Sequence, residues 1–183
     1  GDGDGLAASM EALLGAAIDD GRVLDGVLAA SERQRRELWQ LRENIPAAER
    51  HLGGSVKHDV SVVPSRLPAL AAELERLVGG AFPGYRLSVY GHVGDGNLHF
   101  NVLAPAGRAD PDFVRREGPG ISRLVHDCTA GFGGSFSAEH GIGRWKAGDL
   151  ATYADPVRLG VMRSLKAALD PRGLMNPGKL FAD

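Results

Sequence analysis

Apolar residues recur at helical spacing near the start of the chain. They are Leu6, Met10, Leu13, Leu14, Ala17 and Ile18. A spacing of three to four positions predicts an amphipathic helix, which Asp19-Asp20-Gly21 would end. Ser31, a favourable N-cap residue, predicts the start of a second helix that runs through Leu41 and stops before Pro46. The intervening residues 22–30 fit a short strand.

From residue 55 onward, strand and helix patterns follow one another regularly. The predicted elements are a strand at 55–63, a helix at 65–78 opened by Pro64, strands at 85–92 and 97–104, a helix at 112–130 and a strand at 133–138. This β-α-β-β-α-β order is that of the split βαβ, or ferredoxin-like, unit, in which helices pack on one face of an antiparallel sheet. We therefore expect an α+β fold with further helices at the N- and C-terminal ends.

Two sequence features concern helix boundaries in the second half of the chain. Gly118-Pro119-Gly120 should break or kink the helix predicted at 112–130, because proline lacks an amide donor and clashes with the preceding turn. Asp155 and Pro156 suit the N-cap and first position of a last helix, which residues 170–173 would end. The residues that follow are expected to form an irregular tail.

Charge and composition narrow the class of protein. With 183 residues, the chain can bury roughly 70% of its unfolded surface, which is enough for one domain without disulfides. The formal net charge of -2 provides no basic stripe for a phosphate backbone, so we expect no nucleic-acid partner.

The single cysteine, Cys128, is expected to be a small core residue rather than a nucleophile. No apolar run approaches about 18 residues and no signal-peptide pattern is present, so we expect a cytoplasmic protein.

The stretch GHVGDGNLHFN, residues 91–101, carries the most informative chemistry. Asp95-Gly96 is a two-residue hairpin signal between strand-like segments, and such a turn places His92 directly opposite His99. Opposed Cβ atoms lie roughly 5 Å apart, which suits two imidazole nitrogens that bind one metal. Asn101 would line the same face. A longer loop around the glycines would displace this pairing, and the alternative is that both histidines are ordinary sheet residues beside a turn.

A second stretch, SAEHGIG, places Glu139 and His140 where the strand predicted at 133–138 ends. Glu139 would complete a set of two histidines and one carboxylate, and three protein ligands with an open position are typical of a catalytic metal. His140, pointing away from Glu139, would accept a proton, since imidazole titrates near neutral pH and a nearby cation keeps it neutral. The alternative is a solvated turn.

Two basic residues in the first half are candidates for binding a carboxylate. Arg42 ends the LWQLRE helix and Lys57 lies early in the first clear strand. Arginine holds a planar carboxylate through two parallel hydrogen bonds, and lysine adds a point charge. Each could equally be an ordinary surface charge. No glycine string matches the G-x-G-x-x-G phosphate-binding pattern between a strand and a helix.

Taken together, five segments resemble the C-terminal domain of FAD-linked oxidases of the vanillyl-alcohol-oxidase type. They are WQLRE, KHDVSVVP, GHVGDGNLHFNV, SAEHGIGRWK and DPRGLMNPGKL. The resemblance extends from about Leu6 and is greatest to the D-lactate dehydrogenase, D-2-hydroxyglutarate dehydrogenase and glycolate oxidase subunit branch. It implies that residues 1–183 are a C-terminal domain truncated at its N-terminal side, and that an FAD-binding domain of the same polypeptide would precede residue 1. The fragment alone is expected to be inactive.

The resemblance also implies a ligand set and a reaction. A divalent metal, zinc or manganese, would be held by His92, His99 and Glu139. The implied substrate contacts are Arg42 and Lys57 on a carboxylate, Asn101 on a small 2-hydroxy acid, and His140 as the base that removes the hydroxyl proton. The hydroxy acid would become a 2-oxo acid as hydride passes from its α-carbon to FAD, and a downstream electron acceptor, which the sequence does not identify, would reoxidise the flavin.

Other parts of the chain bear on cofactor, specificity and assembly. The NPGK segment, which contains Asn176, resembles the stretch that returns toward the flavin domain in the family. Asn176 is therefore a candidate cofactor contact, although in this chain the segment could lack contacts with the rest of the domain. Pro46 stands where some relatives carry a hydroxyl residue near the substrate, so the identity of the hydroxy acid is open. A domain truncated in this way would expose a sheet edge and apolar surface, which predicts either a homodimer or poor solubility.

Two other functions are compatible with the same residues. The first is a free-standing metal-dependent hydrolase that uses His92, His99 and Glu139 to activate water. The second is a catalytically silent binding module that keeps the fold without the chemistry. Neither accounts for Arg42 and Lys57 alongside the metal residues.

Overall fold

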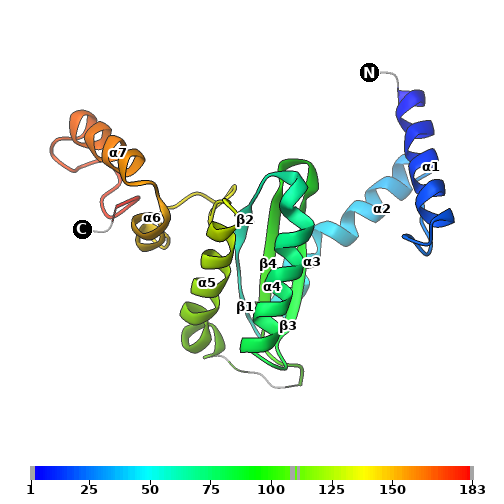
Figure 1. Cartoon of the computed structure of the whole chain (residues 1–183), viewed down its shortest axis with the longest axis horizontal. Helices are drawn as coiled ribbons and strands as arrows, with labels where there is room; N and C mark the ends of the chain where they lie inside the picture. The colour runs from blue at the N-terminus through cyan, green and yellow to red at the C-terminus, as the bar shows by residue number, and fades with distance from the viewer. Residues whose placement is uncertain (1–2, 108–109, 111, 182–183) are drawn as a thin grey trace. The chain divides into compact units, whose positions relative to one another are not determined.

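A computed structural model describes residues 3–107, 110 and 112–181 of the chain. It divides into two compact units, residues 1–47 and residues 48–183. The first unit contains α1 (Gly3–Asp19) and α2 (Glu32–Glu43), as predicted (Figure 1). Ser31 caps α2 as predicted, because its hydroxyl accepts a hydrogen bond from the Gln34 amide at 3.2 Å.

The strand predicted at residues 22–30 is wrong. The described backbone there is turn and irregular coil. A strand needs a hydrogen-bonded neighbour to satisfy its amide and carbonyl groups, and no described strand pairs with this segment. In this first unit, Leu6 of α1 and Leu41 of α2 are both more than two thirds exposed.

Pro46 ends α2 in the predicted place but also begins an element that was not predicted. The short helix α3 (Ile45–Arg50) follows immediately. Proline is tolerated in the first turn of a helix, where its missing amide costs no intrahelical hydrogen bond. The last residues of α3 belong to the second unit and bring Glu49 to the sheet described next.

The second unit is built around an antiparallel sheet whose described strands are β1 (Ser55–Val56), β2 (Asp59–Ser61), β3 (Arg86–His92) and β4 (Asn97–Leu103). β3 pairs along the whole of β4, so β1 and β2 share the other side of β4. Together β1 and β2 form the strand predicted at 55–63, interrupted at Lys57 and His58.

The last strand predicted for the ferredoxin-like unit, at 133–138, is shorter than expected. It contributes an isolated antiparallel bridge between Ser61 and Ser135, and the Ala138 amide donates to the Asp59 carbonyl at 3.0 Å. The spatial order is nevertheless that of the ferredoxin-like sheet: this segment, then β1 with β2, then β4, then β3. The α+β fold is confirmed.

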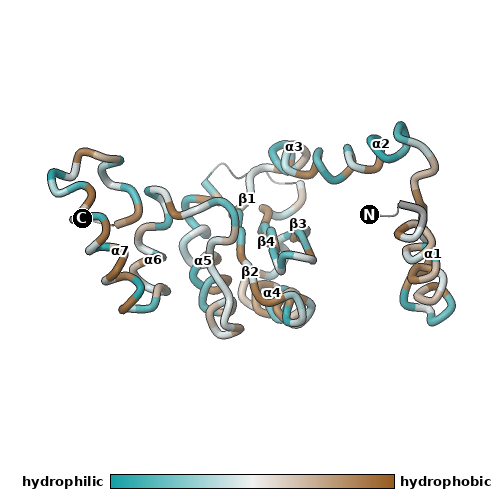
Figure 2. Tube along the Cα trace, turned by 90° about the horizontal axis from the view of Figure 1, so that it is seen from above, coloured by the Kyte–Doolittle hydropathy of each residue, from teal (hydrophilic) through white to brown (hydrophobic). Residues whose placement is uncertain are grey.

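The helices α4 (Leu67–Ala81) and α5 (Phe113–Gly131) cover one face of this sheet. Figure 2 shows both helices on the same side of the strands. The core between the two layers includes Val60, Phe100 and Val102 from the sheet and Leu70 and Val125 from the helices, all of them 0% exposed. Each such side chain contributes about 1.5–3 kcal/mol by leaving water, so the core fixes which face of each strand points away from the helices.

The break predicted at Gly118-Pro119-Gly120 is wrong, since α5 continues through Pro119. Gly118 is buried against Val56 and lacks the Cβ that would clash with the proline ring. Cys128, further along α5, is half-buried against the core, and burial raises the pKa of its thiol. This supports the predicted structural role of the cysteine.

The C-terminal part contains α6 (Ala147–Tyr153), which was not predicted, and α7 (Pro156–Leu169), which was. Asp155 caps α7 by accepting a hydrogen bond from the Arg158 amide at 2.9 Å. The tail that follows is irregular as predicted, but it contacts the rest of the C-terminal part. The Leu180 amide donates to the Gly143 carbonyl at 2.9 Å, and Phe181 packs against a small apolar cluster around Phe136.

Within the described residues, no helix is both long enough and apolar enough to cross a bilayer.

Candidate metal and substrate site

The face of the sheet turned away from α4 and α5 carries polar side chains. Along β4, Leu98, Phe100 and Val102 enter the core, so the alternate residues Asn97, His99 and Asn101 point to the other face. Their partners on β3 are His92, Tyr90 and Ser88, and the partner of His99 on β2 is Asp59. Directly paired residues share a face, so the structure gathers a polar surface here.

The hairpin between β3 and β4 differs from the predicted one. Residues 93–95 form a 3₁₀ turn and Gly96 follows with a φ of 66°, so the loop is longer than two residues. His92 therefore lies opposite Asn97 rather than opposite His99, which corrects the predicted register by two positions. A shift by two keeps each side chain on its face, and the His92 and His99 ring centroids remain 6.2 Å apart.

The loop geometry has a cause outside the hairpin. A Cβ atom on Gly96 would lie 1.8 Å from the Val62 carbonyl oxygen, and the Val62 amide donates to the Gly96 carbonyl at 3.0 Å. The turn is thus shaped by contact with the residue that follows β2. The sequence signal Asp95-Gly96 shows a turn but carries no information on this contact.

Four side chains come together where the segment 133–138 meets the polar face. Potential metal-ligand atoms of Asp59, His99, Glu139 and His140 all lie within 4.8 Å of one another. The Nε2 atom of His99 is 3.1 Å from Oε1 of Glu139, and Nε2 of His140 is 4.0 Å from the same oxygen. The structure therefore brings three of the predicted site residues together and adds Asp59, which sequence reasoning missed.

Two details of this cluster differ from expectation. His140 does not point away from Glu139; its ring stacks on that of His99, with centroids 5.5 Å apart and planes 24° apart. His92 lies beside His99 but outside the four-residue cluster, at the exposed end of β3. Asp59 could have been found from the sequence only with the register of β2 against β4, which places it opposite His99.

The cluster combines two buried side chains with two that solvent can reach. The side chain of Asp59 is 1% exposed and that of His99 is 9% exposed, whereas those of Glu139 and His140 are 50% and 57% exposed. Burial raises the pKa of Asp59, but hydrogen bonds from the His140 and Glu139 amides and from Asn97 outweigh this effect and lower it. A fixed negative charge therefore lies under a site that a ligand can enter.

The donors fit a divalent metal such as zinc or manganese. Imidazole nitrogen and carboxylate oxygen are both ligands for these ions. Neighbouring donors around one tetrahedral zinc lie about 3.4 Å apart for bonds of about 2.05 Å. The separation of 3.1 Å between Glu139 and His99 is close to that value, so this pair needs little movement to accommodate an ion.

Two of the predicted substrate residues meet at a buried carboxylate on the same face. Glu49, at 2% exposure, accepts a hydrogen bond from Asn101 Nδ2 at 2.8 Å, and its Oε2 lies 3.2 Å from Lys57 Nζ. Burial raises the pKa of Glu49, but hydrogen bonds from Asn101, Ser88 and Lys57 outweigh it and lower the pKa. Sequence reasoning missed this role of Glu49 because α3 itself was not predicted.

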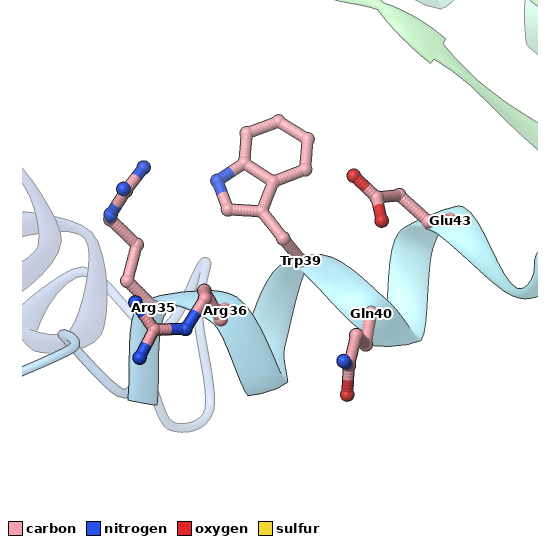
Figure 3. A pocket seen from close by; sticks show the side chains of 5 residues that line it. All are labelled: Arg35, Arg36, Trp39, Gln40 and Glu43. Atoms are coloured by element: carbon pink, nitrogen blue, oxygen red, sulfur yellow. The ribbon is translucent and has the colours of Figure 1, made fainter. Parts of the chain in front are cut away.

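The other predicted contacts lie elsewhere in the chain. Arg42 is in the last turn of α2, within the first unit. On the same helix, a shallow hollow of about 450 Å³ is lined by Arg35, Arg36, Trp39, Gln40 and Glu43, and Figure 3 shows the Trp39 ring standing out from the helix. Asn176 lies in an exposed turn of the C-terminal tail, where its carbonyl accepts from the Lys179 amide at 3.2 Å.

Comparison with known proteins places these observations in a family. Residues 2–180 match the family described as FAD linked oxidases, C-terminal domain. The chain is 38% identical over 165 residues to D-2-hydroxyglutarate dehydrogenase of Stutzerimonas stutzeri (strain A1501), and 42% identical over 164 residues to that of Xanthomonas citri pv. viticola. It is 41% identical over 165 residues to the mitochondrial D-2-hydroxyglutarate dehydrogenase of Bos taurus. Each alignment covers 90% of this chain but only 35%, 34% and 29% of the respective relatives, so the chain spans about a third of their length.

Proposed function

Since the chain belongs to the family of FAD-linked oxidase C-terminal domains, we propose that it is the substrate- and metal-binding part of a flavin-dependent D-2-hydroxyacid dehydrogenase. The observation that carries the proposal is that His99, Glu139 and His140 cluster on the sheet face that also presents Asn101. The relatives are named D-2-hydroxyglutarate dehydrogenases, which makes D-2-hydroxyglutarate the first substrate to test.

The proposed metal ligands are His92, His99 and Glu139. His99 and Glu139 are already within reach of one ion, and the exposed His92 side chain can turn toward it from the end of β3. A divalent ion bound there would lower the pKa of the substrate hydroxyl and so make its deprotonation possible near neutral pH.

Residues of the chain itself would bind the substrate and remove its hydroxyl proton. His140 removes the hydroxyl proton, since its ring is half-exposed beside the metal ligands and a neutral imidazole nitrogen can accept a proton. Asn101 and Lys57 bind the hydroxy acid from the polar face, with the Lys57 side chain 48% exposed and able to meet a carboxylate. Arg42 is proposed to provide a second carboxylate contact.

FAD, when bound, would accept the hydride from the α-carbon. We propose that an FAD-binding domain of the same polypeptide holds the flavin and that Asn176 contributes a minor contact from the C-terminal tail. In this scheme the chain itself binds the substrate, orients its hydroxyl and takes up its proton.

Isothermal titration of the zinc-loaded chain with D-2-hydroxyglutarate, L-2-hydroxyglutarate and D-lactate tests this proposal. We expect metal-dependent binding of a D-2-hydroxy acid that is preferred over its L isomer and weakened in Asn101→Ala. Hydrolytic turnover of ester or amide substrates by the zinc-loaded chain, without binding of any hydroxy acid, would instead support a metal-dependent hydrolase. Absence of both, with zinc bound, would contradict the assigned substrate class.

A further inference from the structure

Asp59 occupies the centre of the polar face without a role in the scheme above. It lies in the short strand β2, opposite His99 on β4, and is 1% exposed. Burying an ionised carboxylate is costly unless hydrogen bonds and opposite charges compensate for the lost water. The partners of this carboxylate therefore indicate what its burial achieves.

The first set of partners is the backbone of the segment that carries the metal-site residues. Oδ2 of Asp59 accepts hydrogen bonds from the Glu139 amide at 2.9 Å and from the His140 amide at 2.8 Å. The backbone carbonyl of Asp59 also accepts from Ala138. Apart from the isolated bridge between Ser61 and Ser135, these Asp59 contacts hold the segment to the sheet and help to determine where Glu139 and His140 lie.

The second set of partners is the two imidazoles of the cluster. Oδ1 of Asp59 is 3.7 Å from Nδ1 of His99, and Oδ2 is 3.6 Å from Nδ1 of His140. With a metal on Nε2 of His99, a negative charge on this side would stabilise the proton on Nδ1. The Nε2 atom of His99 is the one that faces Glu139, as a metal-binding nitrogen must. A carboxylate behind the second ring nitrogen commonly orients a metal-bound histidine.

Asp59 is less suited to be a metal ligand itself. Its oxygens already accept three hydrogen bonds, two from the amides above and one from Asn97 Nδ2 at 2.7 Å. A buried donor that loses its acceptor is costly. Coordination through Oδ2 would therefore disrupt the contacts that hold Glu139 in place.

We propose that Asp59 is a positioning residue that fixes the ring orientation of His99 and the backbone of Glu139 and His140, and so assembles the site before a metal arrives. This inference rests on the proposed metal site. It assigns no contact between Asp59 and the metal or the substrate.

The first test compares zinc affinity, measured by competition with a chromophoric chelator, between the wild-type chain and Asp59→Asn. A matched control is Asp170→Asn, because the Asp170 carboxylate also accepts two backbone amides, those of Leu174 and Met175, but belongs to the C-terminal part. We expect zinc to bind about 10–100-fold more weakly to Asp59→Asn and with unchanged affinity to the control. Equal affinities of Asp59→Asn and wild type overturn the proposal.

A second test requires neither metal nor a folded variant. In the metal-free wild-type chain, the Glu139 and His140 amides should exchange slowly with solvent, because both donate to the buried Asp59 carboxylate. Fast exchange of both amides overturns the proposal. If the wild-type chain binds no zinc, the proposed metal site fails, while this observation still decides the role of Asp59.

Discussion

The side chain of Asn101 in β4 donates a hydrogen bond to the buried carboxylate of Glu49 in α3 at 2.8 Å. Because Glu49 also pairs with Lys57 at 3.2 Å, one carboxylate sets the positions of two proposed substrate contacts. It joins residues that are 52 positions apart in the sequence. The arrangement makes the polar face depend on a helix that contributes no substrate contact of its own.

Removal of Glu49 is expected to destabilise the fold. Glu49→Ala leaves the buried Asn101 amide with only the long hydrogen bond to Tyr90 Oη at 3.4 Å, which should lower the free energy of unfolding by about 1–3 kcal/mol. Glu49→Gln, which can still accept from Asn101, should lose less. Urea denaturation measures both, with the exposed Glu75→Gln on α4 as the control. Equal stability of Glu49→Ala and the control would contradict the role given to this carboxylate.

The loop between β3 and β4 provides a second prediction. Gly96→Ala places a Cβ 1.8 Å from the Val62 carbonyl oxygen at a φ of 66°, so backbone strain and steric overlap should together cost more than about 2 kcal/mol. Gly94→Ala is the matched control in the same loop, because its Cβ would meet nothing within 4 Å and its φ is not in the left-handed region. Thermal denaturation of both variants measures the difference in their midpoint temperatures. Similar midpoints would contradict the close contact between Gly96 and the Val62 carbonyl.

Protonation of His58 is expected to weaken the fold in mild acid. His58 is 2% exposed, with Nδ1 2.8 Å from the Phe100 carbonyl oxygen and Nε2 3.0 Å from Ser122 Oγ. Burial lowers the pKa of His58 from 6.5 to about 4, although the bond to Phe100 opposes the shift. The unfolded state thus binds this proton at a higher pH than the folded state. The free energy of unfolding should therefore fall as the pH drops from 6.5 to about 4, by up to about 3 kcal/mol from this group.

The variant His58→Gln separates this effect from the titration of carboxylates. It lacks the imidazole, so its urea midpoint should depend less on pH than that of the wild type between about pH 7 and about pH 4.5, whatever its absolute stability. Identical pH dependence in the two chains would show that His58 is protonated equally in the folded and unfolded states.

The sequence was sufficient for the order of the sheet strands and their two covering helices and for the polar face. Alternation in β4 separates Phe100 from His99 and Asn101, helical spacing identifies α4, and the cap residues Asp155 and Pro156 identify the start of α7. That alternation also explains why His92 and His99 share a face even though their predicted pairing was wrong.

The missed features depend on contacts between distant residues. The hairpin register depends on Gly96 meeting Val62, and the uninterrupted α5 depends on the buried Gly118 beside Pro119. Asp59 gains its place in the cluster only through pairing with His99, 40 positions away, which no local pattern shows. Spacing alone therefore yields candidate ligands but not the residues that position them.

Metal content of the purified chain, measured by plasma mass spectrometry after dialysis against a weak chelator, tests the central claim most directly. The wild-type chain and His51→Ala, which removes an exposed histidine remote from the cluster in sequence, should retain near-stoichiometric zinc or manganese. His99→Ala should lose it, because His99 is the imidazole closest to Glu139. Absence of metal from all three chains, or equal metal in His99→Ala and wild type, would contradict the proposed site.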